Sequence, residues 1–120
     1  RRLPVGSAMA LGADKIATGL GTGERRNKYD IRVEAYGTVD ETNSAIGVAR
    51  LATANADVLV DAMLLRIQND LFDLGADLAT PEREKPLGWE PLRIVEAQVT
   101  RLETEIDQMN AVIPPLTSFI

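Results

Sequence analysis

The sequence predicts an all-α helical bundle. Three observations support this class: apolar residues make up 45% of the 120 residues, aromatic residues only 4%, and three long stretches repeat apolar side chains every three or four positions. A composition rich in alanine and leucine favours helices packed on helices over a sheet sandwich. The spacing is that of one face of a helix. At this length the chain is one domain or part of one.

The first helix is predicted over residues 31–54, with Asp30 as its N-cap. Its apolar or small stripe comprises Val33, Tyr36, Val39, Asn43, Ile46 and Ala49. Asp40 lies beside this stripe, where a carboxylate is costly unless it is paired or lies at an interface. The alternative, which the sequence leaves open, is that Asp40 points to solvent at the edge of the stripe.

The second helix is predicted over residues 57–79, capped by Asn55 or Asp57 and ended by Thr80-Pro81, because proline disfavours helix at the preceding residue. Its stripe is a continuous predicted core face formed by Leu59, Met63, Ile67, Leu71, Leu74 and Leu78. A helix this apolar is expected to contact more than one neighbour.

Residues 80–91 form a polar, proline-rich connection. Trp89, the single tryptophan, is expected to cover local packing there rather than to stack on a ligand. The third helix is predicted over 92–111, with Arg101 and Glu105 paired on its solvent face. A seam for a neighbouring helix is predicted from Val95, Val99, Leu102, Ile106 and Met109. Three helices with such broad apolar faces are expected to form the first part of a larger bundle.

A glycine-rich segment precedes the first helix. Gly19, Gly21 and Gly23 could turn backbone N–H groups toward an anion. Nearby positive charge comes from Arg25, Arg26 and Lys28. This combination indicates a phosphate site, although glycines alternating with threonines are also typical of a flexible connection.

Composition excludes several function classes. The net charge of −5 gives no indication of nucleic acid or an anionic membrane as partner. The absence of cysteine and histidine removes disulfides, thiolate and imidazole metal sites and histidine-based catalysis, and it fits a cytoplasmic location. No apolar run is long enough to predict a membrane span. Residues 1–8 are expected to be a tag remnant, with Met9 as the native start and 9–120 as the N-terminal portion of one domain.

Four segments resemble the cobalamin adenosyltransferases of the PduO type, in that family's order and spacing. They are Thr22-Gly-Glu-Arg-Arg26, Arg32-Val-Glu-Ala-Tyr-Gly-Thr-Val-Asp-Glu-Thr-Asn-Ser-Ala-Ile-Gly47, Gln68-Asn-Asp-Leu-Phe-Asp-Leu-Gly-Ala-Asp-Leu-Ala-Thr80 and Pro114-Pro-Leu-Thr-Ser-Phe-Ile120. The Gly-Thr-Val-Asp-Glu and Asn-Asp-Leu-Phe-Asp-Leu-Gly runs are the specific part of the match.

The resemblance implies a five-helix bundle that assembles as a homotrimer with active sites between subunits. It implies transfer of the 5′-deoxyadenosyl group of ATP to cob(I)alamin, with Mg²⁺ on the phosphates. A cobalamin reductase and an enzyme that uses the product would be its partners. By position, Thr18 and Gly19 correspond to the ATP loop, and Lys28 to a phosphate-binding lysine. Asp40 corresponds to an aspartate paired with an arginine of the adjacent subunit. Phe119 corresponds to an aromatic residue that fills the space beneath the corrin and displaces the lower axial base of cobalt.

Two departures from the family pattern bear on the nucleotide site. A Tyr-Thr-x-x-Gly-Asp-x-Gly segment, the main part of the family's ATP loop, is expected between Ile16 and Ala17. A Leu-Pro-Gly-Gly run and an arginine-rich helix are expected after Ile120. The hypothesis is that both segments are left out of the sequence, since a chain without them would lack a competent ATP site. The alternatives are a non-catalytic cobalamin or nucleotide carrier and a helical interaction domain.

Overall fold

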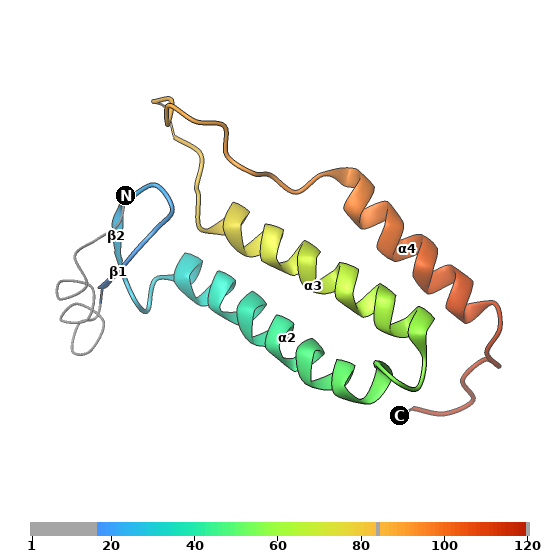
Figure 1. Ribbon diagram of the computed structural model, residues 1–120. Coiled ribbons are helices and arrows are strands. Elements are labelled where there is room, and N and C mark those ends of the chain that lie inside the picture. The colour runs from blue at the N-terminus through green and yellow to red at the C-terminus, as the bar shows by residue number, and fades with distance from the viewer. Residues whose placement is uncertain (1–16, 84, 120) are drawn as a thin grey trace.

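The computed structural model describes residues 17–83 and 85–119. In these ranges a hairpin of two short strands is followed by three helices: β1 (Ala17–Gly19), β2 (Arg25–Asn27), α2 (Ile31–Thr53), α3 (Val58–Leu78) and α4 (Glu96–Asn110). Figure 1 shows the helices side by side and alternating in direction, with the hairpin at the end where α2 begins and α3 ends. The predicted helical class is confirmed. The predicted tag remnant, residues 1–8, lies outside the described residues.

The predicted bounds of α2 and α3 are confirmed to within one residue. The Asp30 carboxylate accepts a hydrogen bond from the Arg32 N–H at 2.8 Å, and Asp57 accepts from the N–H groups of Leu59 and Val60 at 3.1 and 3.0 Å. Each aspartate therefore satisfies amides that the first turn of a helix leaves without internal partners. Of the two predicted caps for α3, Asp57 is the one used.

Helices α2 and α3 pack through apolar stripes and a pair of reciprocal amide bonds. The Asn43 Nδ2 donates to the Gln68 carbonyl, and the Gln68 Nε2 donates to the Asn43 carbonyl, both at 3.1 Å. A Cβ on Gly47 would lie 3.1 Å from the Gln68 Nε2, so glycine leaves room for this side chain between the helices. The predicted core face of α3 is half-buried over most of its length, but Leu59 is exposed.

A cluster of charged groups joins the far ends of α2 and α3. The Arg50 guanidinium donates to both carboxylate oxygens of Asp61 at 3.0 Å, and the Thr53 hydroxyl donates to Asp61 Oδ1 at 2.9 Å. Arg50 also donates to the Gln68 side chain at 2.9 Å. The hydrogen bonds from Arg50 and Thr53 hold the pKa of Asp61 below its ordinary value, and the bond to Asp61 raises the pKa of Arg50.

This lowered pKa predicts a pH-dependent contribution to stability. Because Asp61 has a lower pKa in the folded than in the unfolded chain, its contribution is complete above its ordinary pKa and disappears as the pH falls through the folded value. Asp61→Asn should therefore lower the urea midpoint at pH 7, and the difference from wild type should shrink below about pH 4. Parallel urea titrations monitored by circular dichroism would measure it. Asp107→Asn, at an exposed carboxylate on α4, is the control. A pH-independent difference for Asp61→Asn would contradict the prediction.

The third helix begins later than the sequence predicts, at Glu96 instead of residue 92. The Ile94 N–H donates to Asp77 Oδ2 at 2.8 Å, and the Val95 N–H donates to Gln98 Oε1 at 2.9 Å. These contacts keep residues before Glu96 in an extended path along α3. A tertiary bond therefore replaces the first turn that the apolar spacing predicted.

The predicted pair between Arg101 and Glu105 is wrong. Arg101 donates to Asp70 of α3, and Glu105, only 8% exposed, accepts from Arg66 of α3. Helix α4 thus docks on α3 through the face that was expected to be solvated, because both charges find partners across the interface. Of the predicted apolar seam, only Leu102 is half-buried, and the other four residues are exposed.

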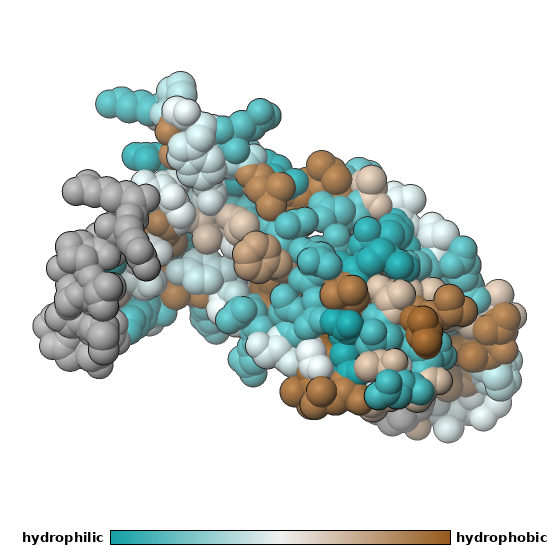
Figure 2. Space-filling model, viewed as in Figure 1, coloured by the Kyte–Doolittle hydropathy of each residue, from teal (hydrophilic) through white to brown (hydrophobic). Residues whose placement is uncertain are grey.

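The described part of the chain buries little apolar surface. Leu20, 6% exposed, is the buried apolar side chain among the described residues. Figure 2 shows apolar side chains in separate patches over the helical part. The exposed large apolar side chains of the described residues include Val48, Leu51, Leu65, Phe72, Val99, Ile106 and Leu116. These side chains are exposed in the described part of the chain, and the expectation of a partial bundle stays a prediction.

Candidate functional site

The glycine-rich segment is a hairpin and not a flexible connection. In the antiparallel pairing of β1 and β2, Thr18 lies opposite Arg26 and Gly19 opposite Arg25. The turn closes with the Leu20 N–H donating to the Glu24 carbonyl at 2.8 Å, and Gly23 adopts a φ of 84°. Because residues other than glycine rarely adopt a positive φ, glycine suits this turn. The hairpin presents Gly19 to solvent, with Thr18 half-buried.

The predicted role of the glycine amides needs correction. The Gly21 N–H donates to the Ala79 carbonyl at 2.8 Å, and the Gly23 N–H donates to the Leu20 carbonyl at 2.9 Å. Both amides are therefore used within the chain, and the prediction that they turn toward an anion is wrong for this structure. Gly21 is small for a different reason, since a Cβ there would lie 2.7 Å from the Thr80 Oγ1.

The positive charge on the hairpin is partly neutralised. Arg26 pairs with Glu24 at 3.1 Å and with Asp30 at 3.5 Å, and the hydrogen bond to Glu24 raises the pKa of its guanidinium. Arg25 donates to the Ala17 carbonyl at 3.1 Å and is exposed. Lys28 is exposed between β2 and the Asp30 cap. The hairpin end of the chain thus carries Arg25 and Lys28 as exposed cations.

Asp40 lies on α2, about 15 Å along the helix axis from the Asp30 cap at 1.5 Å per residue. Its side chain is exposed and makes no hydrogen bond or ion pair with any other residue in 17–83 or 85–119. The second polar residue of the stripe, Asn43, is explained by its bond to Gln68. The Asp40 side chain has no such partner among the described residues, so its pairing across subunits stays a prediction.

Phe119 lies on the tail that follows α4. Its side chain is 101% exposed. Figure 1 shows this tail at the end of the helices opposite the hairpin. One chain therefore separates the five predicted site residues: Thr18, Gly19 and Lys28 lie at the hairpin end, Asp40 on α2, and Phe119 at the far end.

Comparison with known proteins decides the family. The family model described as cobalamin adenosyltransferase matches residues 10–120. The chain belongs to the cobalamin adenosyltransferase family. Corrinoid adenosyltransferases from Mycobacterium leprae and Bacillus subtilis are 47% and 43% identical to it over 109 residues, which is 89% of this chain in both cases.

Solved structures agree with the assignment to the cobalamin adenosyltransferase family. A phenylalanine-to-alanine variant of the PduO-type ATP:corrinoid adenosyltransferase from Lactobacillus reuteri, complexed with cobalamin and ATP, has a TM-score of 0.79 and 32% identity. An arginine-to-lysine variant of the enzyme from that organism, complexed with ATP, has a TM-score of 0.76 and 34% identity. Each match covers 92% of this chain but only 60% and 59% of the solved chain. The chain also spans about half the length of the curated relatives, 56% and 53% of the two named above.

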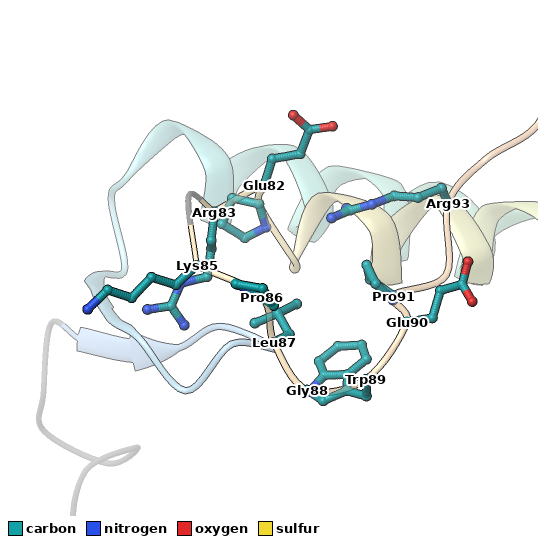
Figure 3. Close-up of a pocket in the computed structure, with 11 residues that line it drawn as sticks. Glu82, Arg83, Lys85, Pro86, Leu87, Gly88, Trp89, Glu90, Pro91 and Arg93 are labelled. Carbon is teal, nitrogen blue, oxygen red and sulfur yellow. The ribbon is translucent and has the colours of Figure 1, made fainter.

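The connection between α3 and α4 in this adenosyltransferase-family chain forms a hollow of about 690 Å³. None of the predicted site residues lines it. Figure 3 shows Trp89, Leu87 and Pro86 on one side of it and the charged ends of Arg83 and Lys85 nearby. Trp89 is half-exposed here, and its predicted role in covering local packing stays a prediction.

Residues 17–83 and 85–119 hold neither a metal-binding group nor a membrane-spanning helix. Within them, no three carboxylates, histidines or cysteines come together as a metal-binding group. None of the described helices combines the length and the apolar character needed to cross a membrane.

The sequence patterns do not predict the junction at the end of α3, which is formed by Asp77, Thr80 and Arg93. Asp77 and Thr80 there are joined to Arg93 of the connection. Arg93 follows Pro91 in a segment without helical spacing, so no periodic pattern points to it. Its only sequence signal is an isolated cation among proline and apolar residues, which is too general to indicate a partner.

Proposed function

We propose that the full-length protein transfers the 5′-deoxyadenosyl group of ATP to cob(I)alamin, forming adenosylcobalamin and triphosphate. The observation that supports this most is the family match over residues 10–120, together with solved neighbours complexed with cobalamin and ATP. Those ligands belong to the neighbours, and their transfer to this chain is part of the proposal.

The chemistry suits a chain without histidine. The Co(I) lone pair attacks C5′ of ATP, a Co–C bond forms, and the C5′–O bond breaks with its electron pair leaving on the triphosphate. No proton has to move in this step. The protein then needs to align cobalt with C5′, stabilise the departing triphosphate and exclude water.

We assign the nucleotide to the hairpin end, with Thr18 and Gly19 at the ATP and Lys28 at its phosphates. The exposure of Gly19, Lys28 and Arg25 supports this assignment. Mg²⁺ would be held mainly by phosphate oxygens, because this ion prefers oxygen ligands. Bound there, the ion would neutralise charge on the leaving group.

We further propose a homotrimer with active sites between subunits. A site shared between copies would bring together residues that one chain holds at opposite ends, and it would supply a partner for the exposed Asp40. Residues 9–120 would form the N-terminal portion of the bundle domain, whose further helices would cover exposed apolar residues such as Ile106 and Met109. A reductase that supplies Co(I) and an enzyme that consumes adenosylcobalamin would complete the set of partners, in the cytoplasm.

The proposal is tested with the full-length protein, chemically reduced cobalamin, ATP and Mg²⁺. The visible spectrum should change to that of the Co–C product, and one triphosphate should appear for each product formed. Bound cobalamin without a spectral change would reject transfer and favour a carrier. Absence of binding to both substrates would favour a helical interaction domain.

A further inference from the structure

The glycine turn rests directly on the end of α3. The Gly21 N–H donates to the Ala79 carbonyl at 2.8 Å, and Leu20 beside it is buried. A Cβ on Gly21 would lie 2.7 Å from the Thr80 Oγ1 and 3.2 Å from the Ala79 carbonyl oxygen. The Thr80 hydroxyl is itself held, because it donates to the Ala76 carbonyl at 3.0 Å. The place of the turn is therefore set by where α3 ends.

Arg93, which lies in the connection that follows α3, also holds this helix end. Its Nη1 donates to Asp77 Oδ1 at 2.7 Å, to the Asp77 carbonyl at 3.2 Å and to the Thr80 carbonyl. Asp77 Oδ2 accepts from the Ile94 N–H, and this bond, with the one from Arg93, keeps the pKa of Asp77 below its ordinary value. Figure 3 shows the side chain of Arg93 extending back along the end of α3.

A cation in this place has a simple physical role. The last carbonyls of a helix have no internal partners and carry the negative end of the helix dipole. Arg93 supplies a donor to these carbonyls from the connection, and Arg32 supplies another from α2, donating to the Leu78 carbonyl at 2.8 Å. The two arginines orient the same short segment against which Gly21 is packed.

We propose that Arg93 is a positioning residue for the nucleotide. By holding Thr80 and Asp77 it sets the end of α3, the end of α3 sets the turn at Gly21, and the turn sets Thr18 and Gly19 against ATP. This inference rests on the function proposed above. Arg93 itself contacts no substrate in it.

The test compares Arg93→Met with Arg101→Met in the full-length protein. Both arginines join the α4 side of the chain to an aspartate of α3, and their side chains are similarly exposed, at 32% and 35%. The aspartate bound by Arg101, Asp70, lies about 10 Å along α3 from Asp77. Arg101→Met therefore removes a comparable contact without touching the junction.

Arg93→Met should raise the dissociation constant for ATP alone, measured by calorimetry, and the KM for ATP about tenfold, with kcat and the KM for cobalamin within about twofold. Hydrogen exchange of the Gly21 amide should quicken, while amides in the middle of α2 keep their protection. Arg101→Met should leave ATP binding and the Gly21 amide unchanged. Arg93→Lys should restore most of the loss, since all of the Arg93 bonds come from one nitrogen.

Each of these measurements can overturn the inference separately. Unchanged exchange at Gly21 in Arg93→Met would show that Arg93 does not hold the turn. Faster exchange with unchanged ATP affinity would show that the turn does not position the nucleotide. An equal loss of ATP affinity in Arg101→Met would show that the effect comes from weaker packing of α4 on α3 in general, and not from the junction at Arg93. If wild type bound ATP but formed no Co–C product, the proposed function would fail while calorimetry and exchange still decided the role of Arg93.

Gly21→Ala provides a second variant that leaves Arg93 intact. It should push the turn off Ala79 by steric conflict and reproduce the weaker ATP binding. Gly37→Ala, where a Cβ would meet nothing within 4 Å in the chain, is the matched control and should leave ATP affinity unchanged. Normal ATP affinity in Gly21→Ala would also overturn the inference.

Discussion

Phe119→Ala should slow adenosylcobalamin formation from Co(II) about 100-fold, while the rate from chemically reduced Co(I) changes only severalfold. The resemblance to the family implies that Phe119 would fill the space beneath the corrin and keep the lower axial base away from cobalt. Without an axial ligand, Co(II) accepts an electron more readily. Loss of the ring would return that ligand and make the reduction step limiting.

The described part of the chain leaves the Phe119 ring exposed, so the ring is available for contact with a ligand or a neighbouring subunit. At 101% exposure, Phe119 contributes no packing to the described chain, so its removal should not change the helical circular dichroism signal. The decisive measurement is the absorption spectrum of Co(II) cobalamin bound with ATP, which should lose its four-coordinate signature. Leu116→Ala, on the same exposed tail, is the control and should retain it. A four-coordinate spectrum in Phe119→Ala would show the assignment wrong.

Asp40→Asn should lower cobalamin affinity and turnover tenfold or more, by about the cost of leaving one member of an intersubunit ion pair alone. The substitution keeps the shape of the side chain and removes only its charge. An arginine of the adjacent subunit would then lie unpaired at the site. The effect should appear in the assembled protein and not in the folding of one chain, since Asp40 is exposed there.

Three measurements distinguish an effect on the assembled site from an effect on the folding of one chain. Cobalamin titration gives affinity, product formation gives turnover, and urea unfolding of the isolated chain gives its stability, which should not change. Glu41→Gln provides the control, because Glu41 is also an exposed carboxylate on α2 and is the next residue along. Equal losses in both variants would indicate a general effect of negative charge on α2. Wild-type turnover in Asp40→Asn would contradict the intersubunit pair.

Local signals predicted much of the helical part. The Asp30 and Asp57 caps and the stripe of α3 act within a few residues, so the bounds of α2 and α3 followed from the sequence to within one residue. The match of the Gly37–Glu41 and Asn69–Gly75 segments to a known family predicted the same family that the comparison of whole chains identified. These inferences depend on contacts that lie close along the chain.

Long-range polar contacts were not predictable in the same way. Arg101 and Glu105 have the spacing of a helical pair, yet each found a partner on α3. The spacing within a helix specifies which side chains share a face, but not which face a neighbour will cover. A long-range contact also explains why the predicted start of α4 is four residues too early. The Ile94 N–H donates to the Asp77 carboxylate, 17 positions earlier in the chain, and not within a first helical turn.

The sequence by itself determined the helical class, the caps and stripes of α2 and α3, and the family, because these depend on residue types and short spacings. Only the tertiary structure decided that the glycine segment is a hairpin packed on the end of α3, that Gly21 is small to fit against Thr80, and that Arg93 holds this junction. It also left the side chains of Asp40 on α2 and of Phe119 on the tail after α4 exposed in the described chain. The physical reason is that hydrogen bonds and close contacts between distant segments depend on three-dimensional placement, which no short pattern encodes.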